Sequence, residues 1–193
     1  SYDKFTGIIE KYSQYADLNS VVKKPSEKQI AITFDDGLLD VYEIAYPFLK
    51  ERNIPFTIFV ITDFLDTPGY ITKDHLKKMA SDSLVTIGSH GVTHKNINSL
   101  SPSEQKYELN HSKEYIEEII GKPVNSFAFS HGQYDKSSVK LMKNYRYGFT
   151  VDSYPLNFIT ARNLKLLPRI NVDNNSFDST CLKLSKIFKG IEK

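Results

Sequence analysis

Two adjacent carboxylates follow an apolar run near the start of the chain. Asp35 and Asp36 come directly after residues 29–34, which are rich in isoleucine, and directly before Gly37. Burying an unpaired carboxylate costs on the order of several kcal/mol, and two neighbouring carboxylates also repel each other. A tight turn, a basic side chain or a metal ion could hold them, and an Asp-Asp-Gly sequence on its own usually marks a turn.

Two histidines follow another apolar run, residues 84–88. His90 and His94 lie within the sequence SHGVTH, and a four-residue spacing on a helical turn predicts that both imidazoles lie on one side. With one carboxylate they form a three-ligand set that leaves metal positions open to water. Because adjacent Asp residues point in different directions, one could bind the metal while the other takes a proton from the water.

Short β-rich runs alternate with helical patterns along the chain. The runs are residues 29–34, 55–61, 84–88, 124–129, 147–151 and, as a sixth candidate, 166–170, and the helical patterns are residues 40–52, 72–80, 101–120, 136–144 and 176–188. This alternation is typical of parallel β/α units, in either an open sheet or a barrel. In both folds the carboxyl ends of the strands meet on one face, so we expect the polar residues after the first, third and fourth runs to form one site.

Capping residues mark several of the expected helix ends. Thr72 and Ser101 are predicted N-caps, and Glu104 completes a capping box with Ser101. Gly121 is predicted to end the helix that Ser101 begins. Pro47 is predicted to bend or interrupt the helix that contains it.

The composition is that of one globular domain. The chain has 193 residues, 40% hydrophobic and 25% charged, and its formal net charge of +2 gives no indication of nucleic-acid or membrane-surface binding. The single cysteine, Cys181, excludes an internal disulfide and is expected to be a small buried hydrophobe. No segment is apolar and long enough to cross a bilayer, and no signal peptide is visible. The chain begins with Ser1 rather than Met, so we expect that upstream sequence has been trimmed.

The order of two motifs resembles that of the polysaccharide deacetylases, the NodB-like carbohydrate esterases. TFDDG at residues 33–37, followed by SHGVTH at residues 89–94, is similar to the first two motifs of that family. The segment at residues 46–65 resembles the family's second β/α unit. FAFSHGQYD at residues 127–135 resembles the third motif, in the variant without the usual arginine that is found in a branch resembling poly-N-acetylglucosamine deacetylases. The resemblance covers roughly residues 28–172 and implies an α/β fold, a shortened and distorted (β/α) barrel, with residues 1–193 as a single domain.

The resemblance also implies a reaction, the metal-dependent removal of N-acetyl groups from amino sugars such as N-acetylglucosamine in a glycan. By motif match, Asp36, His90 and His94 would bind the metal, with zinc expected and cobalt or nickel as alternatives. Asp35 would be the general base. The backbone N–H of His131 would help to stabilise the oxyanion.

Three positions depart from the family pattern. Ala128 stands where the family often has an arginine that holds the catalytic aspartate. His131 stands where the similar branch has tyrosine, and it could act as an acid, stack on sugar or be neutral drift. The chain has no tryptophan to wall the acetyl pocket, and Tyr154 could take that place.

The general acid and the substrate contacts are the least defined parts of the expected site. No histidine follows His131, and none precedes His75, where some branches of the family carry the histidine that protonates the leaving amine. Three alternatives are open: this histidine was in the trimmed N-terminal sequence, His131 replaces it as the candidate acid beside Asp35, or the protein is slow or inactive. Tyr134, Tyr154 and Arg169 are the candidate substrate-binding residues, and Arg169 could alternatively pair with the two aspartates or form a structural ion pair.

Two rival functions remain open at this point. One keeps the site and changes the bond to an O-acetyl ester, and the other is a carbohydrate-binding pseudoenzyme that keeps the metal without turnover. The expected partner is an acetylated amino-sugar glycan rather than nucleic acid, and the expected location is secreted or in a bacterial cell envelope, with the cytoplasm as the alternative. The sequence does not predict an oligomeric state.

Overall fold

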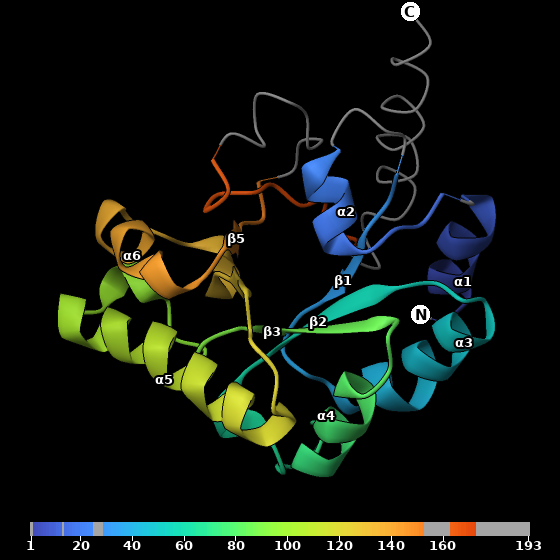
Figure 1. Cartoon of the computed structure of the whole chain (residues 1–193), viewed down its shortest axis with the longest axis horizontal. Helices are drawn as coiled ribbons and strands as arrows, with labels where there is room; N and C mark the ends of the chain where they lie inside the picture. Colours follow the sequence, from blue (N-terminus) through green and yellow to red (C-terminus); the bar gives the residue numbers. More distant parts are fainter. Residues whose placement is uncertain (1, 13, 25–28, 153–162, 173–193) are drawn as a thin grey trace, which may run out of the picture.

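A curled sheet of five parallel strands forms the centre of the molecule. The structure is a computed structural model that describes residues 2–12, 14–24, 29–152 and 163–172 (Figure 1). The strands, in the sheet order β1-β2-β3-β4-β5, are β1 Ile32–Phe34, β2 Phe56–Val60, β3 Val85–Ser89, β4 Ser126–Ala128 and β5 Tyr147–Phe149. Each new strand is added beside the preceding one and in the same direction, as in a barrel wall and unlike a doubly wound sheet. The expected (β/α) barrel, shortened and distorted into a half-barrel, is confirmed.

Most of the α-helices pack against the outer face of this sheet, whereas Leu18 and Val22 of the second helix pack on its inner face. Their bounds are α1 Tyr2–Lys11, α2 Leu18–Lys23, α3 Tyr46–Glu51, α4 Lys73–Ala80, α5 Pro102–Ile120 and α6 Lys136–Leu141. The short irregular helices are the π-helix η1 Val41–Ala45 and the 3₁₀ turns η2 Thr62–Phe64, η3 Ile97–Ser99, η4 Ser130–Gly132 and η5 Met142–Asn144. Figure 1 shows α3, α4, α5 and α6 in succession around the outside of the strands. No helix in the described ranges is long and apolar enough to cross a membrane.

The strand β2 is buried on both faces of the sheet, because helices cover one side and a second apolar cluster covers the other. All five residues of β2 are buried, and Ile58 and Val60 pack in the core beneath the helices. Phe59, which points to the opposite face, belongs to a second, inner cluster with Leu18, Val22, Ala128, Tyr147, Phe149 and Leu167. Gly88 pairs with Phe59 across the strands, and a Cβ atom at Gly88 would lie 2.4 Å from the Phe59 ring. Glycine at this position therefore makes room for the inner core.

Helix ends follow the capping residues that the sequence predicts. Thr72 and Ser101 accept hydrogen bonds at the starts of α4 and α5, and both helices have complete capping boxes. Gly121 ends α5 in the left-handed conformation, with φ 65°. The long helix α5 is therefore fixed at both ends, which matters because its buried face contacts the candidate site.

The interruption predicted at Pro47 is confirmed, whereas one predicted strand differs from the structure. Residues 40–52 are divided between η1 and α3 at Tyr46, beside Pro47, whose missing N–H removes one hydrogen bond of a regular helix. The prediction of a sixth strand at residues 166–170 is wrong, because only an isolated bridge joins Leu167 to Phe149. The next carbonyl of this register, that of Thr150, accepts from the side-chain Nε of Arg169 at 3.1 Å.

Other boundaries differ by a few residues or fall outside the description. The runs predicted at 29–34, 124–129 and 147–151 are longer than β1, β4 and β5, which have three residues each. The helix predicted at 136–144 is divided between α6 and the 3₁₀ turn η5. The helix predicted at 176–188 and the residue Cys181 lie outside the described residues.

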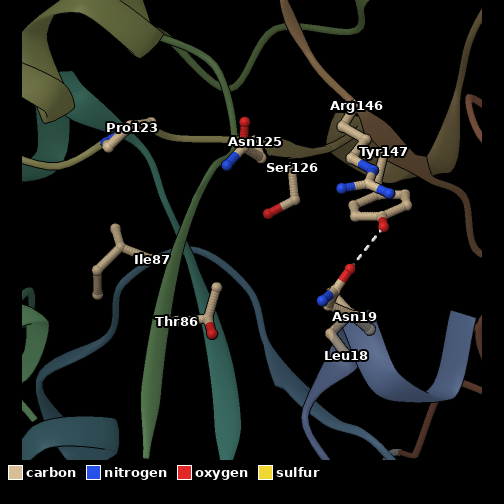
Figure 2. Close-up of a pocket in the computed structure, with 9 residues that line it drawn as sticks. All are labelled: Leu18, Asn19, Thr86, Ile87, Pro123, Asn125, Ser126, Arg146 and Tyr147. Atoms are coloured by element: carbon tan, nitrogen blue, oxygen red, sulfur yellow. Dashed lines mark hydrogen bonds between the residues drawn. The ribbon is translucent and has the colours of Figure 1, made fainter. Parts of the chain in front are cut away.

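A cavity of about 220 Å³ lies where β3 and β4 diverge. The two strands pair only at Ser89 and Phe127, so they separate toward their first residues. Figure 2 shows the cavity between these strand starts, with α2 at its edge and Tyr147 donating a hydrogen bond of 2.7 Å to Asn19. The cavity lies at the amino ends of the strands, whereas the aspartates and histidines follow the carboxyl ends of β1 and β3.

Candidate metal centre

Three side chains with metal-binding atoms converge after β1 and β3. One donor atom from each of Asp36, His90 and His94 lies within 4.8 Å of the others. Asp36 Oδ1 is 3.4 Å from His90 Nε2 and 3.3 Å from His94 Nε2, so both imidazoles face the same carboxylate oxygen. Two imidazole nitrogens and one carboxylate oxygen are a donor set that suits zinc and leaves a position free. The structure therefore brings together the three residues that the sequence predicts as metal ligands.

A backbone carbonyl fixes the orientation of the His90 ring. His90 is 2% exposed, and its Nδ1 atom lies 2.7 Å from the carbonyl oxygen of Ala128. Since a carbonyl oxygen only accepts hydrogen bonds, Nδ1 carries a proton, and Nε2 is the atom that faces Asp36. Metal-binding histidines usually have such a partner on the second ring nitrogen. The residue that replaces the family's arginine thus supports the site through its main chain.

Unusual backbone conformations are concentrated at this site. Among the described residues, five that are not glycine have positive φ, and three of them are Asp36, His94 and His131, at 71°, 60° and 57°. Such conformations are uncommon and are often retained where function requires them. The two imidazoles lie on one side, as expected, but residues 90–94 form an irregular loop rather than a helical turn, with Gly91 at φ 86°. The loop still places the two imidazole centroids 5.1 Å apart.

Asp35 is paired with a basic side chain, Arg169. Arg169 Nη1 donates to Asp35 Oδ1 at 2.6 Å, and Nη2 donates to Oδ2 at 2.8 Å. The guanidinium also donates to Thr33 Oγ1 at 3.2 Å and to the Thr150 carbonyl at 3.1 Å. The two neighbouring carboxylates are therefore stabilised separately. Of the alternatives for Arg169, the structure shows the pairing with Asp35, and its contact with substrate stays a prediction.

Protonation states at the centre suit metal binding. The neighbouring His90 ring lowers the pKa of Asp36 despite the opposing effect of burial. Burial and the neighbouring His90 lower the pKa of His94. Burial raises the pKa of Asp35, but the hydrogen bonds and charge of Arg169 outweigh it, and the pKa is lowered overall. Both aspartates are thus ionised at neutral pH, and His94 is neutral, which are the forms that bind a cation or accept a proton.

The remaining predicted site residues lie at different distances from the centre. His131 is exposed, and its ring centroid lies 4.5 Å from that of His94. Tyr134 is partly buried, and its ring packs against Phe129 at 5.5 Å. Tyr154 lies outside the described residues. Roles for these side chains stay predictions.

Sequence reasoning missed one buried residue beside the centre. Glu108 of α5 is 5% exposed and accepts hydrogen bonds from the loop that contains both histidines. A signal was present, because Gln105, Glu108 and Ser112 are polar residues at the three- and four-residue spacing of the buried helix face that also contains Leu109. Polar side chains on a core-facing stripe require partners, and here the partner is the metal-ligand loop.

Comparisons with known proteins agree with this geometry. A sequence model described as polysaccharide deacetylase matches residues 22–150. YxkH of Bacillus subtilis is 31% identical over 150 residues, which cover 78% of this chain and 53% of YxkH. The poly-beta-1,6-N-acetyl-D-glucosamine N-deacetylase of Staphylococcus epidermidis is 27% identical over 169 residues, covering 79% of this chain and 57% of that protein. The chain thus spans about half the length of the curated relatives it matches.

Solved structures show the same fold. The Streptococcus pyogenes deacetylase PplD, in complex with acetate, matches with a TM-score of 0.82 and 23% identity over 95% of this chain and 84% of PplD. IcaB from Ammonifex degensii matches with a TM-score of 0.78 and 19% identity over 95% of this chain and 87% of IcaB. With the family model covering most of the chain, these comparisons establish that the chain belongs to the polysaccharide deacetylase family.

Proposed function

We propose that this chain is a metal-dependent deacetylase that removes N-acetyl groups from amino sugars of the N-acetylglucosamine type in a polysaccharide. The observation that carries the proposal is the convergence of Asp36, His90 and His94 beside a second carboxylate, Asp35, with its own arginine partner. The name of the Staphylococcus epidermidis relative supports the substrate class. A glycan substrate of this kind favours a secreted or cell-envelope location.

A divalent metal, with zinc as the best fit to two imidazoles and one carboxylate, would be held by Asp36, His90 and His94. When bound, such an ion supplies a water of lowered pKa and polarises the acetyl carbonyl. The chain prepares the ligands in advance, since the Ala128 carbonyl fixes the His90 ring and the Asp36 carboxylate already faces both imidazoles.

Asp35 is the proposed general base, which accepts a proton from the attacking water. Arg169 keeps this carboxylate ionised at neutral pH and fixes its orientation through two hydrogen bonds. Arg169 has further acceptors in Thr33 and Thr150, which favours a role in orienting Asp35 over direct contact with sugar.

His131 is the proposed general acid for the leaving amine. Its imidazole is exposed beside His94, where a bound substrate would reach it. Its main-chain N–H is the proposed oxyanion donor, and the left-handed turn at φ 57° sets the direction of that N–H. Tyr134 and Tyr154 are proposed to contact the sugar.

The other two histidines have structural surroundings. His75 stacks on Tyr42 with the ring centroids 3.9 Å apart, and its Nδ1 atom accepts from the Thr72 N–H. His111 stacks on Tyr107 of the same helix, α5, at 4.8 Å. His131 is therefore the remaining histidine with an exposed ring beside the candidate centre.

Acetate release from N-acetylglucosamine oligomers and from an acetylated sugar ester, with zinc or cobalt added, tests the proposal. Amide turnover that is lost in Asp35→Asn and retained in Asp40→Asn would support the deacetylase function. Asp40→Asn is the control, because Asp40 is an exposed aspartate close to Asp35 in the sequence. Turnover of the ester alone would support an O-acetyl esterase. Stoichiometric metal binding with no turnover of either substrate would support a carbohydrate-binding protein without catalysis.

A further inference from the structure

The buried carboxylate of Glu108 binds the loop that leads to His94. Glu108 Oε2 accepts from the backbone N–H groups of Val92 at 2.6 Å and Thr93 at 3.1 Å. Its Oε1 accepts from the Thr93 hydroxyl at 2.5 Å. One side chain of α5 thus satisfies three donors in the segment between the two proposed histidine ligands. Hydrogen bonds to an ionised acceptor are among the strongest in proteins.

Other contacts hold the same loop from both sides. The Gly91 N–H donates to Ser89 Oγ at 3.2 Å, and Ser89 Oγ donates to Ser112 Oγ at 2.7 Å, so a second residue of α5 takes part. On the other side, the Gly91 carbonyl accepts from the N–H of Thr62 at 3.2 Å. The loop is therefore attached to α5 through its donors and to η2 through its acceptors.

The close approach of Glu108 to Gly91 leaves no space for a side chain at this position of the loop. Gly91 has φ 86°, and a Cβ atom there would lie 2.8 Å from Glu108 Oε2. His94 itself is left-handed, with φ 60°. Strained conformations of this kind persist only where the surrounding structure over-determines them. The two backbone N–H groups that donate to Glu108 belong to the two residues directly before His94.

We propose that Glu108 is a positioning residue for the metal centre. By holding the N–H groups of Val92 and Thr93, it sets the place of the His94 imidazole relative to His90 and Asp36. The inference rests on the proposed function, because it assumes that these three side chains bind a metal. Loss of such supporting contacts outside the ligand set typically weakens metal binding about 10- to 100-fold.

Two substitutions separate the hydrogen bonds from the packing. Glu108→Met has similar length and good helix propensity but no acceptor for the loop. Glu108→Gln keeps one oxygen for the two N–H groups and loses the charge. Glu104→Gln is the matched control, because Glu104 lies one turn earlier in α5, is exposed, and caps the helix at Ser101 without contacting the loop.

Zinc affinity and amide hydrogen exchange are the two measurements, made on the full chain under conditions where each variant is folded. We expect Glu108→Met to bind zinc about 10- to 100-fold more weakly than the wild type, Glu108→Gln to lie between them, and Glu104→Gln to bind as the wild type does. In the metal-free protein, the amides of Val92 and Thr93 should exchange faster in Glu108→Met and keep their protection in Glu104→Gln.

Equal zinc affinity in the wild type and Glu108→Met would overturn the inference and leave the proposed function intact. A wild type that binds no zinc would overturn the proposed function, whereas the exchange measurement on metal-free protein tests the Glu108 contact independently. If Glu108→Met does not fold, Glu108→Gln and Thr93→Val, which removes one donor, replace it. Unchanged zinc affinity in both of those variants would then overturn the inference.

Discussion

Arg169 and Asp35 form a two-point ion pair, with Nη1 2.6 Å from Oδ1 and Nη2 2.8 Å from Oδ2. The two residues are far apart in the sequence, and the pair connects the end of β1 to the segment after β5. In the polysaccharide deacetylases that this chain resembles, an arginine that holds the catalytic aspartate often belongs to the third motif, where this chain has Ala128. Here an arginine also holds the aspartate, but this arginine is Arg169, which follows β5 instead of lying in the third motif.

Replacing Arg169 by methionine should destabilise the metal-free fold in a pH-dependent way. Arg169 lowers the folded-state pKa of Asp35, so the pair stabilises the fold above the unfolded pKa of about 3.9 and loses this effect as the pH falls through the lower folded pKa. We expect Arg169→Met to lose roughly 1.5–3 kcal/mol at neutral pH. The loss should shrink below about pH 4.

Urea unfolding in the presence of a chelator, followed from acid to neutral pH, measures this difference. Lys77→Met is the matched control, because its ion pair with Asp74 is exposed and 4.0 Å long. A difference between wild type and Arg169→Met that stays constant over the whole pH range would show that Asp35 does not depend on Arg169 for its charge.

His131→Asn should separate amide turnover from ester turnover. Asparagine tolerates the left-handed backbone at this position and keeps the main-chain N–H, so the variant removes the imidazole alone. Loss of a general acid typically costs 10²- to 10⁴-fold, roughly, and should affect the amide more because an alcohol leaves more easily than an amine. Acetate release from paired amide and ester substrates measures the effect.

Zinc binding provides the internal control for His131→Asn, since His131 is outside the proposed ligand set and affinity should not change. His111→Asn is the matched variant on the surface of α5 and should keep both activities. If His131→Asn hydrolyses the amide as fast as the wild type does, another group protonates the leaving amine.

Gly88→Ala should destabilise the fold through the inner core. The added Cβ would lie 2.4 Å from the Phe59 ring and 2.9 Å from Ser126 Oγ. Overpacking of this kind typically costs about 1–3 kcal/mol. Thermal unfolding of the variant measures the cost, with the exposed Thr86→Ala on the same strand as control. A melting temperature equal to that of the wild type would contradict the inner packing described for β2 and β3.

The sequence was most informative where a single local rule decided the structure. A continuous apolar run predicted β2, and the capping box at Ser101 with Gly121 predicted both ends of α5. The order of polar residues after strands predicted that Asp36, His90 and His94 would meet, since parallel strands bring their carboxyl ends together.

Features that depend on long-range contacts were not predictable in this way. The π-helix before Pro47 and the irregular loop of residues 90–94 depend on backbone conformations and tertiary hydrogen bonds. The spacing of apolar residues in the sequence does not predict such features. The partners of Arg169 and Glu108 are set by the curl of the sheet and the packing of α5, although both residues are visible in the sequence. The extent of one domain over residues 1–193 stays a prediction.

Acetate release from an N-acetylglucosamine oligomer, measured while metal-stripped protein is titrated with zinc, tests the central claim most directly. The account predicts that activity is absent without metal, rises to a plateau near one zinc per chain, and is lost in His94→Ala, because one ligand of the set of Asp36, His90 and His94 is then missing. Amide hydrolysis by the stripped protein at the same rate as by the zinc-loaded protein would contradict it.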